Sequence, residues 1–541
     1  MDLILHNGNI ITMDKRSPRV RAVAARGGKI VASGQDAAVL TLREPATTVV
    51  DLKGKTVVPG FNDSHMHLLG YALTRNMVDL RRCHGAGELA RAIQGHIREH
   101  EIGQGAWVFG WGWDQTLFAD REMPTRADLD IASTEHCLVA LRTCGHLCAV
   151  NTATLRAAGI FEKPPAVKGG SVAVDKHGVP TGVLAEKAMD LVLGLLPSIG
   201  KDIIKALILM AAEDFLKAGL TSVQTDDLAH FKGDVSEVLN AYIELDQAGA
   251  MPLRVNAQLL LPTLEKLRAF LAMGYRTGFG SDFFKIGPLK LLTDGSLGGR
   301  TAYLAAPYSD DPGSRGIPVL NRELLEELVE TAHAAGMQVA AHAIGDAAVE
   351  MALDSFARAQ KSHPRDDPRF RIIHASFVRP DLLDRFKRQR LAADIQPAFV
   401  PSDSPFVEDR LGPDRARWVY CWRSFLEKGI RMGGGSDCPV ESYQPLLGLH
   451  AAVTRQDLSG HPPGGWFPGQ KLTVEEALAI FTLGSAYCSF EEDLKGSITP
   501  GKLADMVVLS EDITRINPDQ IKDMTVEMTV MHGKLVWAAD R

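Results

Sequence analysis

The sequence has few of the features that mark secreted, membrane-spanning or nucleic-acid-binding proteins. Seven cysteines in 541 residues are an odd number and too few for a disulfide framework, which favours a reducing compartment. No apolar run reaches the ~18 residues of a membrane span, and the first residues lack a signal-peptide pattern. The net charge is −7, and no block of lysine and arginine indicates a nucleic-acid surface. We therefore expect a cytoplasmic protein that binds neither membrane nor nucleic acid.

The two ends of the chain differ in pattern from its middle. Short runs rich in β-branched residues predict strand regions near both ends, and Gly27-Gly28 predicts a hairpin turn. The predicted strand regions are Leu3–Met13, Val20–Val31, Thr47–Leu52, Ala504–Leu509 and Thr525–Ala538. We expect residues 1–57 and 491–541 to form one small composite β-sandwich domain. Two unrelated β extensions are the alternative.

The middle of the chain alternates between helical and strand-like segments. Helical periodicity predicts helices over Asp202–Ala218, Val235–Ala248, Asn321–Ala335, Asp346–Gln360 and Pro413–Lys428. The strand-like segments are Thr56–His67, Thr221–Thr225, Arg254–Leu260, Ile286–Asp294, Gln338–His342, Arg371–His374, Ala392–Gln396 and Arg431–Asp437. Eight such units predict an α/β protein, a (β/α)8 barrel of the TIM type, over residues 58–490.

A long segment separates the first two predicted barrel strands. Leu68–Gly219 holds roughly 150 residues, which is too long for a simple crossover and predicts an inserted subdomain at about residues 68–200. The insertion has strand-like segments of its own at Ala106–Trp111 and Cys137–Thr143. Because it leaves the barrel at the carboxyl end of a strand, we expect part of it to line the substrate pocket.

Polar side chains stand at the ends of several predicted barrel strands. His65 and His67 are two residues apart, so on a strand both project to the same face. His342 and His374 each end an apolar strand, and Asp437 follows three glycines at the end of the last one. Each of these residues alone is more often structural. Together, at the catalytic ends of barrel strands, they predict a metal site.

This pattern resembles the amidohydrolase superfamily of metal-dependent barrel hydrolases. It is most similar to the third amidohydrolase family, the YtcJ-like proteins, which includes N-substituted formamide deformylases. The resemblance extends over essentially the whole chain. The segments that carry it are PGFNDSHMHLLGYA, GWGWDQ, GHLCAVN, TGVLAE, KLLTDGSLGGRTA, AHAIGDAAVEMALD, RIIHASFVRPD, DIQP and GGGSDCPVES.

The resemblance implies a ligand set for one or two divalent metal ions, with zinc the expected metal. His65 and His67 would hold the more buried ion, with Asp437 as a further ligand. His342 and His374 would hold a second, more exposed ion. Asp437 would also be the catalytic base.

Two further residues carry alternative interpretations. Lys290 matches a strand-4 lysine that members of the superfamily often carboxylate, which would turn it into an anion that bridges two metals. An ordinary ion pair with Glu186 or Asp294 is the alternative, because a lysine in an apolar strand is costly to bury charged and unpaired. Glu186 itself could ligate metal or orient the substrate.

The resemblance and the position of the insertion also indicate pocket residues. His146 matches a position that should face the substrate and stabilise an oxyanion. Trp111, Trp113 and Asp114 are expected to line the same pocket. Arg300 could hold a carboxylate or carbonyl group, with a structural ion pair as an equal alternative.

One departure from the superfamily pattern bears on the reaction. Deaminases carry a general-acid glutamate three residues after the strand-5 histidine, where this sequence has Gly345. We therefore expect hydrolysis of a C–N bond in a small-molecule amide, N-acyl or N-formyl, by attack of metal-bound hydroxide. A deaminase or lactonase is the alternative enzyme, and a non-catalytic binding protein is the alternative from another class. The oligomeric state is open, with a homodimer among the alternatives.

Overall fold

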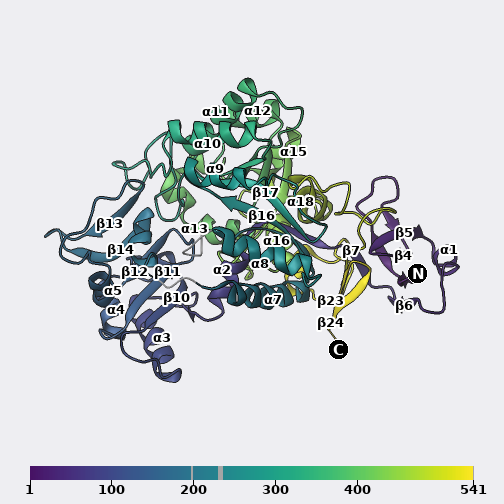
Figure 1. Ribbon diagram of the computed structural model, residues 1–541, viewed down its shortest axis with the longest axis horizontal. Helices are drawn as coiled ribbons and strands as arrows, with labels where there is room; N and C mark the ends of the chain where they lie inside the picture. Colours follow the sequence, from purple (N-terminus) through teal and green to yellow (C-terminus); the bar gives the residue numbers. More distant parts are fainter. Residues whose placement is uncertain (196–198, 229–234, 540–541) are drawn as a thin grey trace.

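Eight parallel strands form the centre of the molecule, with helices packed outside them (Figure 1). The computed structural model describes residues 1–195, 199–228 and 235–539. In sheet order the strands are β21 (Arg431–Gly434), β20 (Ala392–Ile395), β19 (Arg371–His374), β18 (Val339–Ala343), β17 (Phe284–Leu292), β16 (Arg254–Leu260), β15 (Leu220–Asp226) and β8 (Phe61–Met66). Each overlaps one of the eight predicted segments, and the barrel of the TIM type is therefore confirmed.

The helices around the barrel follow the predicted periodicity. The longer ones are α7 (Lys201–Lys217), α8 (Val235–Gln247), α9 (Leu264–Ala272), α10 (Arg322–Ala334), α11 (Asp346–Ser362), α12 (Pro380–Gln389), α13 (Phe399–Leu411) and α16 (Pro445–Thr454). Among the described helices, none combines the length and the apolarity needed to cross a membrane.

One predicted helix is wrong. Pro413–Lys428 forms two short helices, α14 (Pro413–Ala416) and α15 (Trp422–Glu427), instead of one. Between them Val419 bridges Phe377, and the amide of Tyr420, in the left-handed region at φ 53°, donates to the carbonyl of Ser376 at 2.8 Å. These bonds to a neighbouring segment replace the bonds that a continuous helix would make.

The first predicted strand divides at Gly60. β7 (Thr56–Pro59) pairs with β22 (Met506–Leu509) near the other end of the chain, whereas β8 enters the barrel. A Cβ atom at Gly60 would lie 2.1 Å from Oγ1 of Thr221, so only glycine fits where the chain passes between the two sheets.

Strands from both ends of the chain share one sheet. Its order is β24 (Lys534–Ala538), β23 (Val526–Met531), β22, β7, β2 (Asn9–Ile11) and β3 (Arg19–Val20). A four-stranded sheet holds β5 (Lys29–Gly34), β4 (Ala22–Arg26), β1 (Leu3–His6) and β6 (Thr48–Asp51). The turn at Gly27-Gly28 is confirmed, with both glycines at positive φ. The boundaries of the predicted domains stay predictions.

The segment between β8 and β15 contains its own six-stranded sheet, at the opposite end of the molecule from the terminal strands (Figure 1). The sheet order is β13 (Gly170–Val174), β14 (Pro180–Glu186), β12 (Leu147–Val150), β11 (Cys137–Arg142), β10 (Trp107–Trp113) and β9 (Val78–Asp79). Its helices include α3 (Ala86–Glu99), α4 (Arg126–Ala132) and α5 (Thr152–Ala157). Both strands predicted in the insertion, at 106–111 and 137–143, are confirmed.

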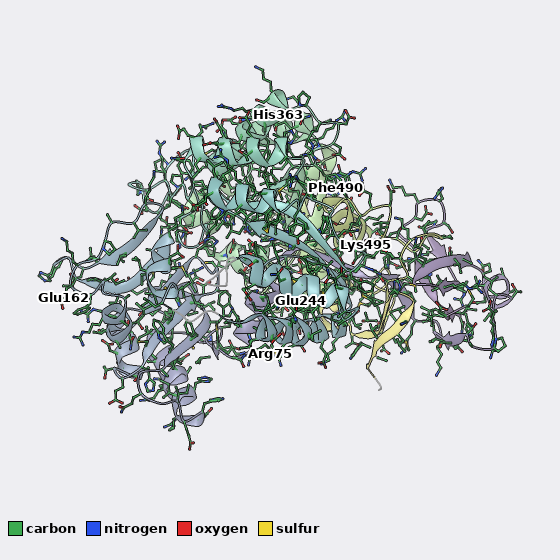
Figure 2. All side chains as sticks on the ribbon, viewed as in Figure 1. Arg75, Glu162, Glu244, His363, Phe490 and Lys495 are labelled. Carbon is green, nitrogen blue, oxygen red and sulfur yellow. The ribbon has the colours of Figure 1, made fainter. Side chains whose placement is uncertain are left out.

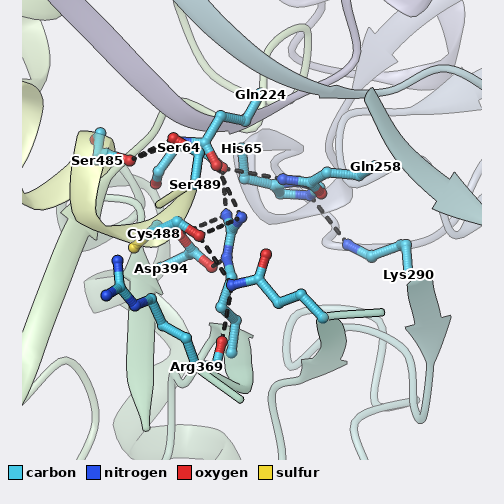
Figure 3. A network of polar contacts seen from close by, with 12 residues as sticks. Ser64, His65, Gln224, Gln258, Lys290, Arg369, Asp394, Ser485, Cys488 and Ser489 are labelled. Atoms are coloured by element: carbon cyan, nitrogen blue, oxygen red, sulfur yellow. Dashed lines mark hydrogen bonds and ion pairs between the residues drawn. The ribbon is translucent and has the colours of Figure 1, made fainter. Parts of the chain in front are cut away.

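A charged pair lies inside the barrel. The side chains of Arg371 and Asp394 are 0% exposed, and two guanidinium nitrogens donate to the two carboxylate oxygens at 2.8 and 2.9 Å. Arg371 also donates to the backbone oxygen of Ser64 and to Oε1 of Gln224, both at 2.8 Å. The network around Asp394, Ser64 and Gln224 is drawn in Figure 3. One buried guanidinium therefore connects strands β8, β15, β19 and β20.

We predict that Arg371→Ala lowers the free energy of unfolding by about 3–5 kcal/mol, because it leaves the Asp394 carboxylate buried and unpaired. Urea denaturation followed by circular dichroism measures the change. Lys428→Ala is the matched control, since it breaks an exposed pair with Asp384 and should cost less than about 0.5 kcal/mol. An equal loss in both variants would contradict the assigned role of Arg371.

Candidate metal centre

Three predicted ligands converge at the carboxyl ends of the first and last barrel strands. His65 lies on β8, His67 follows it directly, and Asp437 follows β21. Oδ1 of Asp437 lies 3.2 Å from Nε2 of His65 and 3.1 Å from Nε2 of His67. Among the described residues, this is the group of three ligand-type side chains whose donor atoms all lie within 4.8 Å of one another.

Backbone hydrogen bonds hold the two ligand loops together. The amide of Asp437 donates to the carbonyl of His65 at 2.8 Å, and the amide of His67 donates to the carbonyl of Cys438 at 2.7 Å. A Cβ atom at Gly435 would lie 2.8 Å from the amide nitrogen of His65, so this glycine-rich strand end lies too close to the backbone of β8 for a side chain. The backbone hydrogen bonds of Asp437 and His67 join the ends of β8 and β21, where the barrel closes.

Hydrogen bonds to oxygen acceptors orient both imidazoles. Nδ1 of His65 lies 2.8 Å from Oε1 of Gln258, and Nδ1 of His67 lies 2.7 Å from the backbone oxygen of Asp226. Each Nδ1 must carry the proton to donate to these oxygens, so each Nε2 presents a lone pair toward Asp437. Nε2 of His65, Nε2 of His67 and a carboxylate oxygen then converge, and the Lys290 amine lies 3.2 Å from the first of these atoms. A cation satisfies this arrangement, so the residues fit a metal ion.

The charge states of the cluster suit metal binding. Burial, together with the nearby Lys290 charge, lowers the pKa of His65 well below its usual value. Burial alone would raise the pKa of Asp437, but His374, His65 and His67 hold it well below its usual value. Burial opposes protonation of His67, but the hydrogen bond to Asp437 and the charge of that carboxylate raise the pKa of His67. Neutral imidazoles and an ionised carboxylate are the forms that ligate a divalent cation, so a bound cation would displace a proton that His67 carries.

Lys290 lies directly against this cluster. It is 1% exposed on β17, its Nζ lies 3.2 Å from Nε2 of His65, and burial lowers its pKa to about 8. The alternative ion pairs are not formed, because Glu186 bonds His146 while Asp294 accepts from three backbone amides, including that of Gly345. A partly neutral amine in a dry site is the form that reacts with CO₂, whereas a charged one there is costly.

The other two predicted histidines gather beside the cluster. The rings of His342 and His374 are 4.5 Å apart, and His374 is 5.6 Å from His65. Nδ1 of His374 lies 2.8 Å from Oε1 of Gln396, and burial lowers the pKa of His374 to about 4. The five histidine and aspartate ligands are thus neighbours, although the tight group of three contains neither His342 nor His374.

A histidine from the insertion faces the same region. The ring of His146 is 5.2 Å from that of His342, and its Nδ1 lies 2.9 Å from Oε2 of Glu186. Although burial opposes it, the Glu186 carboxylate raises the pKa of His146 to about 9. Oε1 of Glu186 is buried and has no hydrogen-bond partner among the described residues. The His146–Glu186 pair therefore places a protonated imidazole of the insertion, a hydrogen-bond donor, close to the predicted metal ligands.

The expected pocket residues of β10 have different environments. Trp111 lines a cavity of about 380 Å³ together with Cys438 and Glu441, next to the Asp437 loop. Trp113 is fully buried in the core of the insertion, where its indole donates to a backbone oxygen, so the expectation that it lines the pocket is wrong. Asp114 accepts from Arg142 at 2.7 Å and from the amide of Thr116 at 2.9 Å, which makes it part of a buried ion pair and a cap.

Arg300 is not next to the metal ligands. Its guanidinium pairs with Asp310 at 2.9 Å, which is the predicted structural alternative. It lines a larger cavity, of about 690 Å³, and none of His65, His67 and Asp437 lines that cavity.

The position that holds an acid in deaminases has no room for a side chain. A Cβ atom at Gly345 would lie 2.1 Å from the backbone oxygen of Tyr303. The next residue, Asp346, begins α11, pairs with Arg379 at 2.9 Å and accepts from the backbone amide of Ala305 at 2.9 Å. Neither residue can act as the deaminase general acid.

Sequence reasoning missed several residues that hold the ligands in place. Asp63 accepts from the amides of His65 and Ser436, both at 3.0 Å, and burial raises its pKa to about 7. Gln258 and Gln396 orient two ligand histidines. In the sequence, each of these residues is a polar side chain within or directly after an apolar strand. Its role can be assigned only when the residues that it faces on the neighbouring strand are known.

Comparison with known proteins agrees with this geometry. A family profile described as "Amidohydrolase family" matches residues 48–537. The YtcJ protein of Bacillus subtilis (strain 168) is 36% identical over 543 residues, 99% of each chain. The N-substituted formamide deformylase of Arthrobacter pascens is 27% identical, over 99% of this chain and 98% of that protein. The crystal structure of an uncharacterized metal-dependent hydrolase from Pyrococcus horikoshii OT3 is 31% identical with a TM-score of 0.76, over 95% of this chain and 99% of that one. The chain therefore belongs to the amidohydrolase family.

Proposed function

We propose that the protein is a metal-dependent amidohydrolase that cleaves the C–N bond of a small-molecule amide, N-acyl or N-formyl. The observation that carries the proposal is the convergence of two imidazole lone pairs and the Asp437 carboxylate on one point. Full-length similarity to an N-substituted formamide deformylase supports the amide class. The crowded backbone at Gly345 argues against deamination.

The ligand set suits zinc, which takes imidazole nitrogen and carboxylate oxygen donors. His65, His67 and Asp437 would hold the first ion. His342 and His374 would hold a second, and a carboxylated Lys290 would bridge the two. When bound, a divalent cation polarises a carbonyl group and lowers the pKa of a water molecule toward ~7.

The residues of the chain supply the proton transfers and part of the charge stabilisation. Asp437 accepts a proton from the attacking water and delivers it to the leaving nitrogen. His146, held at Nδ1 by Glu186, donates from Nε2 to the carbonyl oxygen as that oxygen gains negative charge. Trp111 contacts the body of the substrate. The new C–O bond replaces the C–N bond, and the products are a carboxylic acid and an amine.

Product analysis tests the reaction class. Incubation of the zinc-loaded protein with N-substituted formamides and N-acyl amides should release the amine together with formate or the matching acid. Release of ammonia from an aminated ring would instead identify a deaminase, and release of a hydroxy acid from a lactone would identify a lactonase. No turnover of any of these substrates would contradict the proposed function.

For the amide that turns over best, we predict that Asp437→Asn lowers kcat by at least ~10²-fold, since the amide cannot accept the proton from water. Circular dichroism and the thermal midpoint should match those of the wild type. A normal kcat in a folded Asp437→Asn variant would assign the base to another carboxylate, with Glu186 the next candidate.

We predict that the purified protein carries one or two divalent ions per chain and that His65→Ala/His67→Ala loses them. Elemental analysis by mass spectrometry gives the metal content independently of activity. His96→Ala/His100→Ala is the matched control, because it removes two adjacent histidines on and next to α3. Equal metal content in both double variants would rule out the assigned ligands.

For Lys290, we predict that replacement by alanine lowers metal content and activity together. Short carboxylic acids with bicarbonate should partly restore both by occupying the vacated space. Lys495→Ala is the control, since Lys495 is a second buried lysine, bonded to Ser222 and Glu491 rather than to a proposed ligand, and is labelled in Figure 2. Its loss should cost stability and leave the metal in place.

A crystal structure decides the same question directly. Carboxylation requires three extra atoms on the Lys290 nitrogen in contact with both ions. A bare lysine in a fully metallated crystal grown with bicarbonate would show that Lys290 acts as an ammonium group.

A further inference from the structure

A second cavity lies between the insertion and the loops of the barrel. Its volume is about 690 Å³, within the range typical of small-molecule sites. The insertion contributes Gln115, Met123 and Val183 to its wall. The loop after β17 contributes Arg300, and the helix α13 contributes Arg410. None of the proposed metal ligands lines it, so it is separate from the metal centre.

Two cations share one anion at this cavity. The guanidinium groups of Arg300 and Arg410 both bond the carboxylate of Asp310. The side chain of Arg410 is only 7% exposed, and that of Arg300 is 35% exposed. Nη2 of Arg410 also donates to the backbone oxygen of Gly298 at 3.3 Å. The three charged groups therefore leave one positive charge uncompensated in a partly buried place.

Arg410 has an unused donor. Its Nε is buried and has no hydrogen-bond partner in the part of the chain that the structure describes. Burial, together with the Arg300 charge, lowers the pKa of Arg410, as expected for a cation that lacks a full counter-charge. A buried donor without an acceptor costs free energy that a ligand oxygen would recover.

The other charges at the cavity balance this one only in part, although Asp409 acts on Arg410. Arg121 and Asp409 pair with each other at 3.5 Å and are more than half exposed, and Glu122 is exposed as well. Solvent screens charges at such positions. The lining also includes apolar side chains, among them the buried Val183 and Phe406, beside several hydroxyl groups.

We propose that this cavity is a second ligand site, which binds an organic carboxylate with an apolar body. The carboxylate would accept from Arg410 and Arg300, since guanidinium groups bond carboxylates with paired donors. The apolar body would pack against Met123, Val183 and Phe406. One negative charge matches the single uncompensated positive charge, which favours a carboxylate over a phosphate dianion.

Calorimetry on the full-length protein tests the site with phenylacetate as the probe. Phenylacetate should bind, whereas phenylacetamide, which has the same shape and no charge, should bind at least ~10-fold more weakly. Phenyl phosphate tests the other anion, and tighter binding of it would overturn the choice of a carboxylate. His65→Ala/His67→Ala should leave the Kd of phenylacetate unchanged, which separates this site from the metal centre and from the proposed reaction.

Variants of the cavity complete the test. Arg410→Gln and Arg300→Gln should each raise the Kd at least ~10-fold, and Arg417→Gln, at an exposed arginine of the same region, should not change it. Ala173→Phe, which keeps both arginines and fills the cavity from β13, should also abolish binding and serves if Arg410→Gln fails to fold. Absence of phenylacetate binding up to about 10 mM, an unchanged Kd in these cavity variants, or loss of binding in the histidine variant would each overturn the proposal.

Discussion

The buried charge of Arg371 is the constraint on which the geometry of the metal centre rests. Its guanidinium is fully buried and must be satisfied, so it bonds Asp394, Gln224 and the backbone oxygen of Ser64. The amide of Gln258 donates to the same oxygen of Ser64, and its Oε1 accepts from Nδ1 of His65 (Figure 3). The orientation of His65, the first proposed ligand, is therefore fixed by a polar network that begins in the interior of the barrel.

A second constraint is the closure of the barrel between β8 and β21. Asp63 accepts amides from both strand ends, and backbone bonds join the His67 and Asp437 loops. The same hydrogen bonds therefore close the barrel and position the proposed ligands. By joining the ends of the two strands, they set the 3.1–3.2 Å contacts of Asp437 with the imidazoles. The glycines of the last strand permit this approach, since a side chain at Gly435 would overlap the amide of His65.

The insertion adds chemistry that the barrel lacks. It brings the His146–Glu186 pair to the ring of His342, it places Trp111 beside the Asp437 loop, and it closes one wall of the cavity that contains Arg300 and Arg410. The barrel thus holds the proposed metal ligands, whereas the insertion supplies the side chains around them that we propose contact a substrate or ligand. This division is common in barrels of this type, whose loops vary while the strand ends keep the chemistry.

The sequence by itself determined the eight strands and the positions of the proposed ligands at their ends, because apolar runs of strand length and the His or Asp residues that follow some of them are local patterns. It also located the insertion and two of its strands. Only the tertiary structure decided that Trp113 faces the insertion core rather than the pocket. Regular alternation along β10 would put Trp113 on the same face as Trp111, but an irregularity in the pairing with β11 between these two residues, at Gly112 with φ 100°, turns Trp113 to the core. The same holds for the division of Thr56–His67 at Gly60, the break of the helix at Tyr420, and the roles of Gln258 and Asp63. Each of these depends on a contact between residues far apart in the chain, and such contacts leave no periodic trace in the sequence.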